Sequence, residues 1–469
     1  MKINAQKALQ SELSPYKKWQ IKWSIAAGVV FAGPYSVAMS NLGFQSIFAH
    51  LFEMDFIKPM RFFYDMQESP EGDLQPKNLP VLFFSIPFEL DYMQALKMLK
   101  NWDIPLSPSE RDKTHPVLIC GGAAPTLNPK VPEGIFDAVI RGDFMAVLED
   151  IEKAMRMLLA PGGRKNFIGQ IKKLGENNEI YRIERKPEFS RIVSSLAAFR
   201  NMFLIEIQKS CIFKCGFCAT PYIYGDFRNF DKNQIMSIIQ KHNPGTDRIG
   251  LVGSAIAEHP ELGDIISELT AKGMKISTSS IRMDRINQSV MDTLYKSGAN
   301  SITIAPETHI EKLYSIIGKH ITANEIIKAC RDMPFNEVKL YYIIGFEGEK
   351  PEDVAYLGEQ IARIAESNPK IKFSISINPF IPKPGTRLAK DGMQKDSEIK
   401  VKYKIIKKSL QKSKNIRLTA NYSFRQRLEA LIALGDIEIA KCLIESAHDK
   451  PIKHVLRKNG IEIKDAIYP

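Results

Sequence analysis

The stretch QKSCIFKCGFCATPYIYGDFR, residues 208–228, determines how the rest of the chain is interpreted. It contains three cysteines, Cys211, Cys215 and Cys218, in the spacing C-x3-C-x2-C. The apolar run Met202–Gln208 predicts a short buried strand, so we expect the thiols on a loop at the carboxyl end of that strand. Three thiolates at this spacing can bind three irons of a [4Fe–4S] cube and leave the fourth iron open for a ligand.

A zinc site is the alternative interpretation, because zinc also binds closely spaced cysteines. Structural zinc takes four ligands, usually as two pairs. The next histidine and the next cysteine after the loop are His242 and Cys330, and neither is near it in the sequence. The spacing therefore favours the iron–sulfur cluster. Phe217, directly before the last cysteine of the motif, suits a flat ligand lying beside such a cluster.

This loop and its aromatic residue resemble the signature of the radical SAM superfamily. The resemblance implies that the open iron binds the amino and carboxylate groups of S-adenosylmethionine (SAM). Reductive cleavage would then yield a 5′-deoxyadenosyl radical that abstracts a hydrogen atom from a substrate. It also implies an electron donor of low potential, of the flavodoxin or ferredoxin type. The cofactors carry this chemistry, and the protein supplies ligation and orientation.

Length and composition indicate an ordinary soluble globular protein. The 469 residues are enough for two or three domains, and 44% hydrophobic and 25% charged residues are typical values. The longest apolar run, at 24–33, is too short to span a membrane, so no membrane partner is expected. Six cysteines, three of them clustered, do not form a secreted disulfide framework and predict a reducing cytoplasm.

The cysteine count also limits the number of clusters. Superfamily members that transfer methylthio groups need three further cysteines, usually in the N-terminal domain, where this chain has only Cys120. Downstream of the loop only Cys330 and Cys442 remain, and both lie in apolar helical patterns typical of core residues. We therefore predict one cluster per chain.

Residues 23–160 alternate strands with helices, which predicts a doubly wound, Rossmann-like parallel sheet. Ligands of such sheets bind beyond the carboxyl ends of the strands. Strands are expected from Ala26, at Val81–Ser85, at Val117–Cys120 and at Ala138–Ile140, with helices at 36–53, Tyr92–Lys100 and Leu148–Leu159.

This arrangement resembles the cobalamin-binding domain that precedes many radical SAM cores, through Gly121–Thr126 (GGAAPT) and Arg141–Asp143 (RGD). Cobalamin binders with a protein ligand to cobalt use D-x-H-x-x-G. When the motif is aligned on Gly43, Ser40 takes the place of its histidine. A serine cannot replace an imidazole on cobalt. Cobalamin bound without a protein ligand therefore stays open, and loss or repurposing of the domain is favoured.

The remaining segments complete the predicted domain plan. Residues 1–22 are expected to be a polar, frayed lead-in, and weak periodicity after Pro161 predicts a connector at 161–198. The radical SAM core is expected at 199–392, followed by a basic helical C-terminal region at 393–469.

The core is predicted to be a partial (β/α)6 barrel of the TIM type, with its chemistry at the carboxyl ends of the strands. After Met202–Gln208, strands are expected at Arg248–Val252, Lys275–Thr278, Ser301–Ala305, Glu337–Ile344 and Lys372–Ile377. Helices are expected at Pro260–Lys272, Gln288–Ser297, Thr322–Arg331 and Pro351–Ser367, the third with a Thr322 capping box.

Residues at these strand ends are candidates for binding SAM, as the resemblance implies. Small residues permit close approach, and hydroxyl and charged groups suit a ribose and an amino acid. Each alone is weak, because such residues commonly cap the next helix. The candidates are Gly253 and Ser254 for the methionyl amino group, Ser279 and Ser280 for ribose, Arg282 for the carboxylate, Glu307 for the ammonium or ribose, and Gly345 for adenine.

The C-terminal region carries much of the net charge of +12. Lys400–Arg417 contains eight basic residues and no acidic one, so it is a candidate contact for the phosphates of RNA. The favoured alternative is the solvated face of a helix that packs through Val401, Ile405 and Leu410. Beyond it, Arg425–Ser446 is expected to form two short helices around Gly435 that cap the barrel.

The sequence thus supports one leading function and two alternatives. The leading hypothesis is a radical SAM enzyme that abstracts hydrogen from an unknown substrate. The first alternative is a cobalamin-dependent radical SAM methyltransferase. The second, from another class, is a nucleic-acid-binding protein whose cluster is structural or sensory.

Overall fold

A computed structural model describes residues 3–16, 23–176, 180–181, 186–279, 288–298, 301–420 and 422–461. The chain is α/β and forms two compact units. The first, here called the N-terminal unit, contains Met1–Leu204, His242–Thr246 and Leu431–Ala466. The second, here called the barrel unit, contains Ile205–Lys241, Asp247–Ala430 and Ile467–Pro469. Each unit is described by itself.

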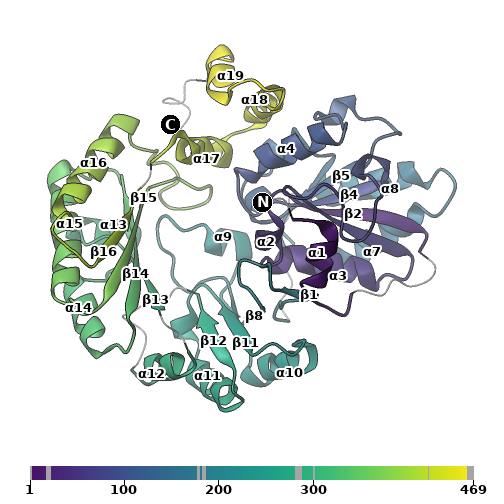
Figure 1. Cartoon of the computed structure of the whole chain (residues 1–469). Helices are drawn as coiled ribbons and strands as arrows, with labels where there is room; N and C mark the ends of the chain where they lie inside the picture. Colours follow the sequence, from purple (N-terminus) through teal and green to yellow (C-terminus); the bar gives the residue numbers. More distant parts are fainter. Residues whose placement is uncertain are drawn as a thin grey trace. The chain divides into compact units, whose positions relative to one another are not determined.

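The N-terminal unit is built on a five-stranded parallel sheet in the order β3-β2-β4-β5-β6 (Figure 1). This confirms the predicted Rossmann-like sheet. Every residue of β2 is buried, as expected for strands covered on both faces. The strands are β2 (Ile25–Phe31), β3 (Ile57–Phe63), β4 (Val81–Ser85), β5 (Val117–Gly121) and β6 (Ala138–Ile140).

Helices cover both faces of this sheet. Phe44 and Phe48 of α3 and Phe167 of α8 join the core on one face, and Tyr92 of α4 packs near Phe136 on the other. The helices are α2 (Tyr35–Ala38), α3 (Leu42–Glu53), α4 (Asp91–Asn101), α5 (Ala123–Leu127), α6 (Lys130–Glu133), α7 (Leu148–Met157) and α8 (Gly163–Glu176). Neither β3 nor α8 was predicted.

The two segments predicted to be frayed or linking are in fact docked on this unit. The lead-in forms α1 (Ala5–Gln10) and β1 (Glu12–Leu13), and β1 pairs antiparallel with β7 (Val193–Ser194) of the predicted connector. The fully buried Gln45 of α3 accepts from the backbone N–H groups of Arg191 and Ile192 at 2.7 and 2.8 Å. Long-range pairing of this kind leaves no local periodicity in the sequence, so it was missed.

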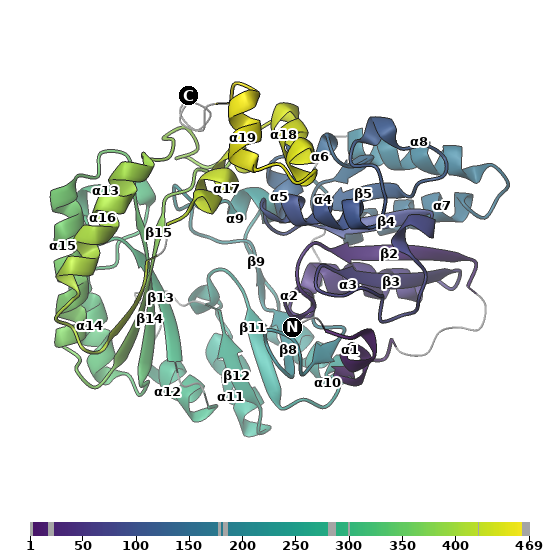
Figure 2. The ribbon, with the colours of Figure 1, turned by 45° about the horizontal axis from the view of Figure 1, so that its top comes forward.

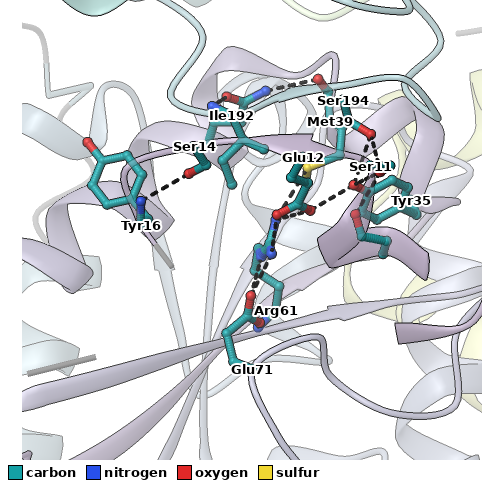
Figure 3. Close-up of polar contacts among 12 residues, drawn as sticks. Ser11, Glu12, Ser14, Tyr16, Tyr35, Met39, Arg61, Glu71, Ile192 and Ser194 are labelled. Carbon is teal, nitrogen blue, oxygen red and sulfur yellow. Dashed lines mark hydrogen bonds and ion pairs between the residues drawn. The ribbon is translucent and has the colours of Figure 1, made fainter. Parts of the chain in front are cut away.

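A buried ion cluster fixes the lead-in to the sheet (Figure 3). Arg61 of β3 is 1% exposed and lies between two carboxylates. Its Nη1 donates to Glu12 Oε1 at 2.9 Å, and its Nε donates to Glu71 Oε1 at 2.7 Å. The Tyr35 hydroxyl donates to Glu12 at 2.7 Å. Because a buried charge is tolerated only with such partners, this cluster explains why a polar N-terminal segment is held in place.

The C-terminal helices α17 (Phe424–Leu434), α18 (Ile437–Ala447) and α19 (Ile452–Lys458) differ from the predicted barrel cap. The segment Leu431–Ala466 belongs to the N-terminal unit, where α18 contacts α4 and α6. The Asn128 side chain donates to the carbonyls of Ala433 and Gly435 at 3.0 and 2.8 Å, which satisfies groups left open at the end of α17. A distant side chain made this contact, so the local sequence did not show it.

The barrel unit contains the predicted strands as two parallel sheets, β12-β11-β8 and β13-β14-β15-β16 (Figure 2). The partial barrel is therefore confirmed, with β16 added as a seventh, parallel strand. The strands are β8 (Met202–Glu206), β11 (Arg248–Val252), β12 (Lys275–Thr278), β13 (Ser301–Glu307), β14 (Glu337–Ile344), β15 (Lys372–Pro379) and β16 (Ile416–Thr419).

The four predicted helices of the core are present as α11, α12, α14 and α15, whereas α10 and α13 were not predicted, and Thr322 makes the predicted capping box with Glu325. They are α10 (Lys232–His242), α11 (Leu262–Ala271), α12 (Gln288–Lys296), α13 (Glu311–Ile317), α14 (Ala323–Asp332), α15 (Pro351–Glu366) and α16 (Asp396–Ser409). In the described part of the chain, no helix combines the length and the apolar character needed to cross a membrane.

Helix α16 carries the basic strip, and the predicted packing residues are only partly right, since Leu410 is buried and Ile405 is half-buried. Val401 is 49% exposed, whereas Ile399, Tyr403 and Ile406 are buried. One basic residue of the strip, Lys402, is itself buried, because its ammonium donates to the Glu349 carboxylate at 2.6 Å. The other lysines of this helix, Lys400, Lys404, Lys407 and Lys408, are exposed, as expected for a solvated face.

Candidate functional site

The cysteine loop is closed at its base by a short hairpin. Strand β9 (Gln208–Lys209) pairs antiparallel with β10 (Arg228–Asn229). The Ser210 hydroxyl donates to the Gly225 carbonyl at 2.5 Å, directly inside this pairing. Ser210 has a φ of +64° and Gly225 one of +73°, so both take left-handed backbone to turn the chain into the loop. The base of the loop therefore has a defined conformation.

The middle of the loop is held between two other segments. Gly216 donates its N–H to the Ile317 carbonyl at 2.9 Å and accepts from the Leu388 N–H at 3.0 Å. A Cβ atom at Gly216 would lie 2.6 Å from the Ile316 carbonyl oxygen, closer than real side chains approach. Arg387 donates to this same carbonyl. Only glycine fits between Cys215 and Phe217, a requirement that the sequence reading missed.

The three thiols are neither buried nor fully exposed. Cys215 and Cys218 are joined by a turn, in which the Cys218 N–H donates to the Cys215 carbonyl at 3.1 Å, and the Cys218 sulfur lies 3.3 Å from Thr220 Oγ1. Among the described residues, no three His, Cys, Asp or Glu side chains gather in an arrangement that would hold a metal ion. In a [4Fe–4S] cluster each cysteine binds a different iron, so the three sulfurs do not need to surround one metal ion.

The aromatic residue of the loop packs against the end of the fifth barrel strand. The Phe217 ring lies 6.4 Å from the Phe346 ring, and Phe346 lies 5.2 Å from Phe380 after β15. Phe346 is 1% exposed, whereas Phe217 is only partly buried. The row of rings ties the cysteine loop to the ends of β14 and β15 and leaves part of Phe217 accessible.

The turn after β11 contains two predicted SAM contacts. Gly253 lies against Gln208, since a Cβ atom there would be 2.9 Å from Gln208 Oε1. Gln208 is 2% exposed, and its Oε1 has no hydrogen-bond partner among the described residues. Ser254 is exposed, and the Ser279 hydroxyl donates to the Gly253 carbonyl. The Ser279 hydroxyl thus already joins two strand ends, while Gln208 offers a buried acceptor that the sequence reading did not single out.

Glu307, at the end of β13, is held in an ion pair rather than presented alone. It takes a φ of +68° after a register shift between β13 and β14. Its Oε1 accepts from Lys319 Nζ at 3.0 Å, and both residues are more than 90% buried. Lys319 follows Gly318, which packs near Cys215. The predicted Glu307 carboxylate is therefore paired with the Lys319 ammonium. The sequence did not reveal this pair because Glu307 precedes α13 and Lys319 follows it.

Gly345, predicted to let adenine approach, has a structural reason for being glycine. Its φ is +90°, and a Cβ atom would lie 2.6 Å from Ile399 Cδ1 of α16. Its N–H donates to Glu349 Oε1 at 2.7 Å. Burial raises the pKa of Glu349, and the Lys402 ammonium opposes that rise. Packing of α16 alone accounts for this glycine.

All the described candidates lie at the carboxyl ends of β11 to β14 or on the cysteine loop. Ser280 and Arg282 lie outside the described residues. The roles of the candidates in binding SAM stay predictions.

The corresponding edge of the N-terminal sheet is filled by the chain itself. The Thr126 hydroxyl donates to the Gly122 carbonyl at 2.7 Å and accepts from the Gly142 N–H at 2.9 Å. A Cβ atom at Gly142 would lie 2.0 Å from the Tyr181 carbonyl oxygen. The two stretches that resemble a cobalamin site are thus bonded to each other and covered by residue 181.

Ser40, at the position of the absent histidine, is also engaged by the fold. Its hydroxyl donates to the Ser36 carbonyl at 3.3 Å and accepts from the Phe199 N–H at 3.1 Å. The next residue, Asn41, caps α3 through its side chain. This segment therefore serves the start of α3 and the docking of the chain near Phe199.

Comparison with known families gives two matches. Residues 205–361 match the family described as the radical SAM superfamily, and residues 50–181 match the one described as radical SAM proteins, N-terminal. The first match contains the cysteine loop and the strands β11 to β14, and the second contains most of the N-terminal sheet.

Two relatives cover different shares of the chain. An uncharacterised protein of Methanocaldococcus jannaschii is 26% identical over 396 residues, which is 82% of this chain and 84% of that protein. The ribosomal protein uS12 methylthiotransferase RimO of Leptospira biflexa is 26% identical over 261 residues, which is 52% of this chain and 56% of that protein.

A similar solved structure is that of TsrM from Kitasatospora setae, a radical S-adenosylmethionine methyltransferase seen with cobalamin and a [4Fe–4S] cluster. The TM-score is 0.53 at 9% identity, over 91% of this chain and 99% of that one, which is a likeness of fold. Membership of the superfamily implies a [4Fe–4S] cluster and SAM as cofactors. The chain belongs to the radical SAM superfamily and is a radical SAM enzyme, with the superfamily's domain at 205–361 preceded by the radical SAM N-terminal domain at 50–181.

Proposed function

We propose that Cys211, Cys215 and Cys218 bind a [4Fe–4S] cluster with one open iron and that the enzyme cleaves SAM there to abstract hydrogen from its substrate. The main support is the loop that carries the thiols. It is closed at its base by β9 and β10 and held in its middle at Gly216. Such preorganisation is what a cluster that must orient a substrate requires.

When bound and reduced, the cluster would supply one electron to SAM, giving methionine and a 5′-deoxyadenosyl radical that takes a hydrogen atom from the substrate. The chain's own residues would orient SAM. The unpartnered Oε1 of Gln208 suits an N–H donor such as the methionyl amino group. The accessible part of Phe217 would lie beside the bound molecule, and the ion pair with Lys319 would hold the Glu307 carboxylate in position.

The test is anaerobic reconstitution with iron and sulfide, followed by reduction in the presence of SAM and detection of 5′-deoxyadenosine. We expect about four irons per chain, and loss of both the cluster and the product in Cys215→Ala. Cys330→Ala is the matched control, because it removes a buried thiol of α14 and should keep both. Equal loss in the two variants, or iron well above four per chain, would contradict the proposal.

We also propose an electron donor and a cellular location for this reaction. A flavodoxin- or ferredoxin-type protein would deliver the electron, since the cluster must reach a low potential. The cytoplasm is the proposed location, because partly exposed thiols and an open cluster require a reducing compartment.

A cobalamin-dependent methyl transfer is a second candidate, favoured by the fold likeness to the TsrM structure with cobalamin. The N-terminal edge argues against a protein ligand to cobalt, since Ser40 is bonded within the fold and Gly142 is covered by Tyr181. Reconstitution with cobalamin decides between the two candidates. A corrin spectrum that stays with the protein through gel filtration would support the methyltransferase, and none would remove it.

RNA binding through the strip Lys400–Arg417 is the remaining proposal. Four lysines of α16 are exposed, namely Lys400, Lys404, Lys407 and Lys408. They would give an affinity for RNA that falls steeply with salt. An affinity that does not change with salt would exclude this use of the strip.

A further inference from the structure

The sheet of β13 to β16 has two faces with different surroundings. Figures 1 and 2 show α14, α15 and α16 on one side of it. Tyr342 of β14 points to that side, since it is fully buried, its hydroxyl donates to His309 at 2.9 Å, and it lies close enough to Cys330 of α14 to interact electrostatically. Side chains alternate across a strand, so Lys339 and Tyr341 point to the opposite face. We call this opposite face the inner face.

The inner face is polar and open. Every residue that the four strands place on it is at least partly exposed. A closed barrel of eight strands fills the same space with branched apolar side chains. Here hydroxyl and amide groups take their place, among them Thr303, Ser374, Ser376, Asn378 and Thr419. A surface of this chemistry inside an enzyme barrel is suited to a polar substrate.

Strand register aligns two cations on this face. Lys339 of β14 pairs with Ser374 of β15, and Ser374 pairs with Arg417 of β16. The two cations therefore stand in one row across the strands, on either side of a hydroxyl. Because neighbouring strands are about 4.8 Å apart, their backbones are about 10 Å apart, a span over which both long side chains can reach one anion.

The charge of the inner face is unbalanced. Lys372 adds a third cation, and the acidic residue of these strands on this face, Glu337, accepts a hydrogen bond from the Ser374 hydroxyl at 2.8 Å. Within the described ranges, no carboxylate lies at ion-pair distance from Lys339, Lys372 or Arg417. An anion is the ligand that this imbalance favours.

An aromatic ring lies beside the two cations. Tyr341 is 41% exposed and pairs in register with Ser376, and Ser376 pairs with Thr419. Tyr341 is two residues from Lys339 towards the carboxyl end of β14, a distance of about 6.7 Å along the strand. An exposed ring three residues before the carboxyl end of β14, with the cations farther from that end, is suited to a flat heterocycle linked to an anionic group.

We propose that the inner face binds the enzyme's substrate and that this substrate is a mononucleotide, with its base on Tyr341 and its phosphate between Lys339 and Arg417. This inference rests on the proposed radical SAM function and names a substrate class for it. A mononucleotide is favoured over RNA because the described part of the inner face offers one exposed ring and one aligned pair of cations. A longer strand would use several stacking rings.

The test uses the full-length reconstituted protein with an oxidised cluster and saturating SAM, so that the SAM site is filled. Equilibrium dialysis measures the binding of uridine 5′-monophosphate and of uridine. We expect Lys339→Gln and Arg417→Gln each to weaken binding of the monophosphate about tenfold and to leave uridine unchanged, as loss of a charge-assisted contact predicts. Tyr341→Leu should weaken both ligands by the same factor.

Lys404→Gln is the matched control, because it removes an exposed lysine of α16 on the other side of the sheet. If the monophosphate does not bind, or binds alike in Lys339→Gln and Lys404→Gln, the inference is wrong. Much tighter, steeply salt-dependent binding of a uridine decamer would replace the mononucleotide with RNA. Formation of 5′-deoxyadenosine without substrate tests the radical SAM function separately, and the control Lys404→Gln should form as much of it as the wild type.

Discussion

Cations have opposite surroundings in two of the parallel sheets, the five-stranded sheet of the N-terminal unit and the sheet of β13 to β16, which we call the barrel sheet. In the N-terminal sheet, Arg61 is 1% exposed and bonded to both Glu12 and Glu71 (Figure 3). In the barrel sheet, Lys339 and Arg417 lie on an open face with no carboxylate partner in the described part of the chain. A cation whose partners belong to the fold serves stability, whereas one without such partners is available to a ligand.

The same contrast holds for the edges where ligands would bind. At the N-terminal edge, the Thr126 hydroxyl accepts from the Gly142 N–H, and the Tyr181 backbone lies directly against Gly142. At the barrel edge, the Gln208 side-chain oxygen is buried without a hydrogen-bond partner in the part of the chain that the structure describes, and Phe217 stays partly accessible. Resemblance to a motif therefore indicated a site in both units, and the residues that carry it are bonded within the fold in the N-terminal unit but partly accessible on the cysteine loop of the barrel unit.

The largest effect is expected at Arg61. Arg61→Met would leave Glu12 and Glu71 buried without their cation and lower the free energy of unfolding by about 3–5 kcal/mol. Lys339→Met is the matched control on the inner face and should change it by less than about 0.5 kcal/mol. Urea unfolding followed by circular dichroism measures both. Similar losses of unfolding free energy in the two variants would show that Arg61 and Lys339 do not differ in their contribution to stability.

On the helix-facing side of the barrel sheet, polar side chains should have their hydrogen-bond partners within the fold, as Arg61 does in the N-terminal sheet. His309 donates to the Ile321 carbonyl at 3.1 Å and accepts from Tyr342, and burial lowers its pKa from 6.5 to about 4. Between these two pH values the unfolded chain binds a proton that the folded chain does not. Stability should therefore fall by up to about 3 kcal/mol as the pH drops from about 6.5 to about 4.

Urea midpoints of the cluster-free protein at several pH values between 7.5 and 4 test this loss. His309→Gln should show a shallower decline, because the titrating imidazole is absent while His259 remains. An unchanged decline in that variant would show that His309 does not have the expected pKa.

A smaller effect is expected at Thr126. Thr126→Val removes the acceptor of the Gly142 N–H and should destabilise the N-terminal unit by about 1–3 kcal/mol. Thr126→Ser keeps the hydroxyl and should be close to the wild type. Formation of 5′-deoxyadenosine at a temperature where both variants are folded should be unchanged. Its loss in Thr126→Val alone would indicate that this edge takes part in the reaction after all.

The smallest effect is expected at Tyr341, whose side chain meets solvent rather than core. Tyr341→Ser should change the unfolding free energy by less than about 0.5 kcal/mol. A large loss of stability, measured by the same urea titration, would mean that the inner face is part of the packed structure and not a free surface.

Much of the fold could be predicted because the relevant signals are local. Three barrel strands, Arg248–Val252, Lys275–Thr278 and Glu337–Ile344, begin and end where the apolar pattern indicated. The Thr322 capping box was read from residues three positions apart. Strand β3 was missed because Lys58 and Pro59 interrupt its apolar run, although the neighbouring strand β2 accepts it as a parallel partner.

The features of the candidate site likewise fall into those set by neighbouring residues in the sequence and those set by tertiary contacts. By itself the sequence determined the thiol spacing, the alternation of strands and helices and the end of the sheet at which function was expected, since these depend on residues that are near one another in the chain. Only the tertiary structure decided that Gly216 lies against the Ile316 carbonyl and that Lys319 pairs with Glu307. It also decided that Lys402 is buried and that Lys339 aligns with Arg417 across the strands. The reason is physical: a side chain's partner and exposure are set by segments that meet only after folding, so local periodicity does not contain them.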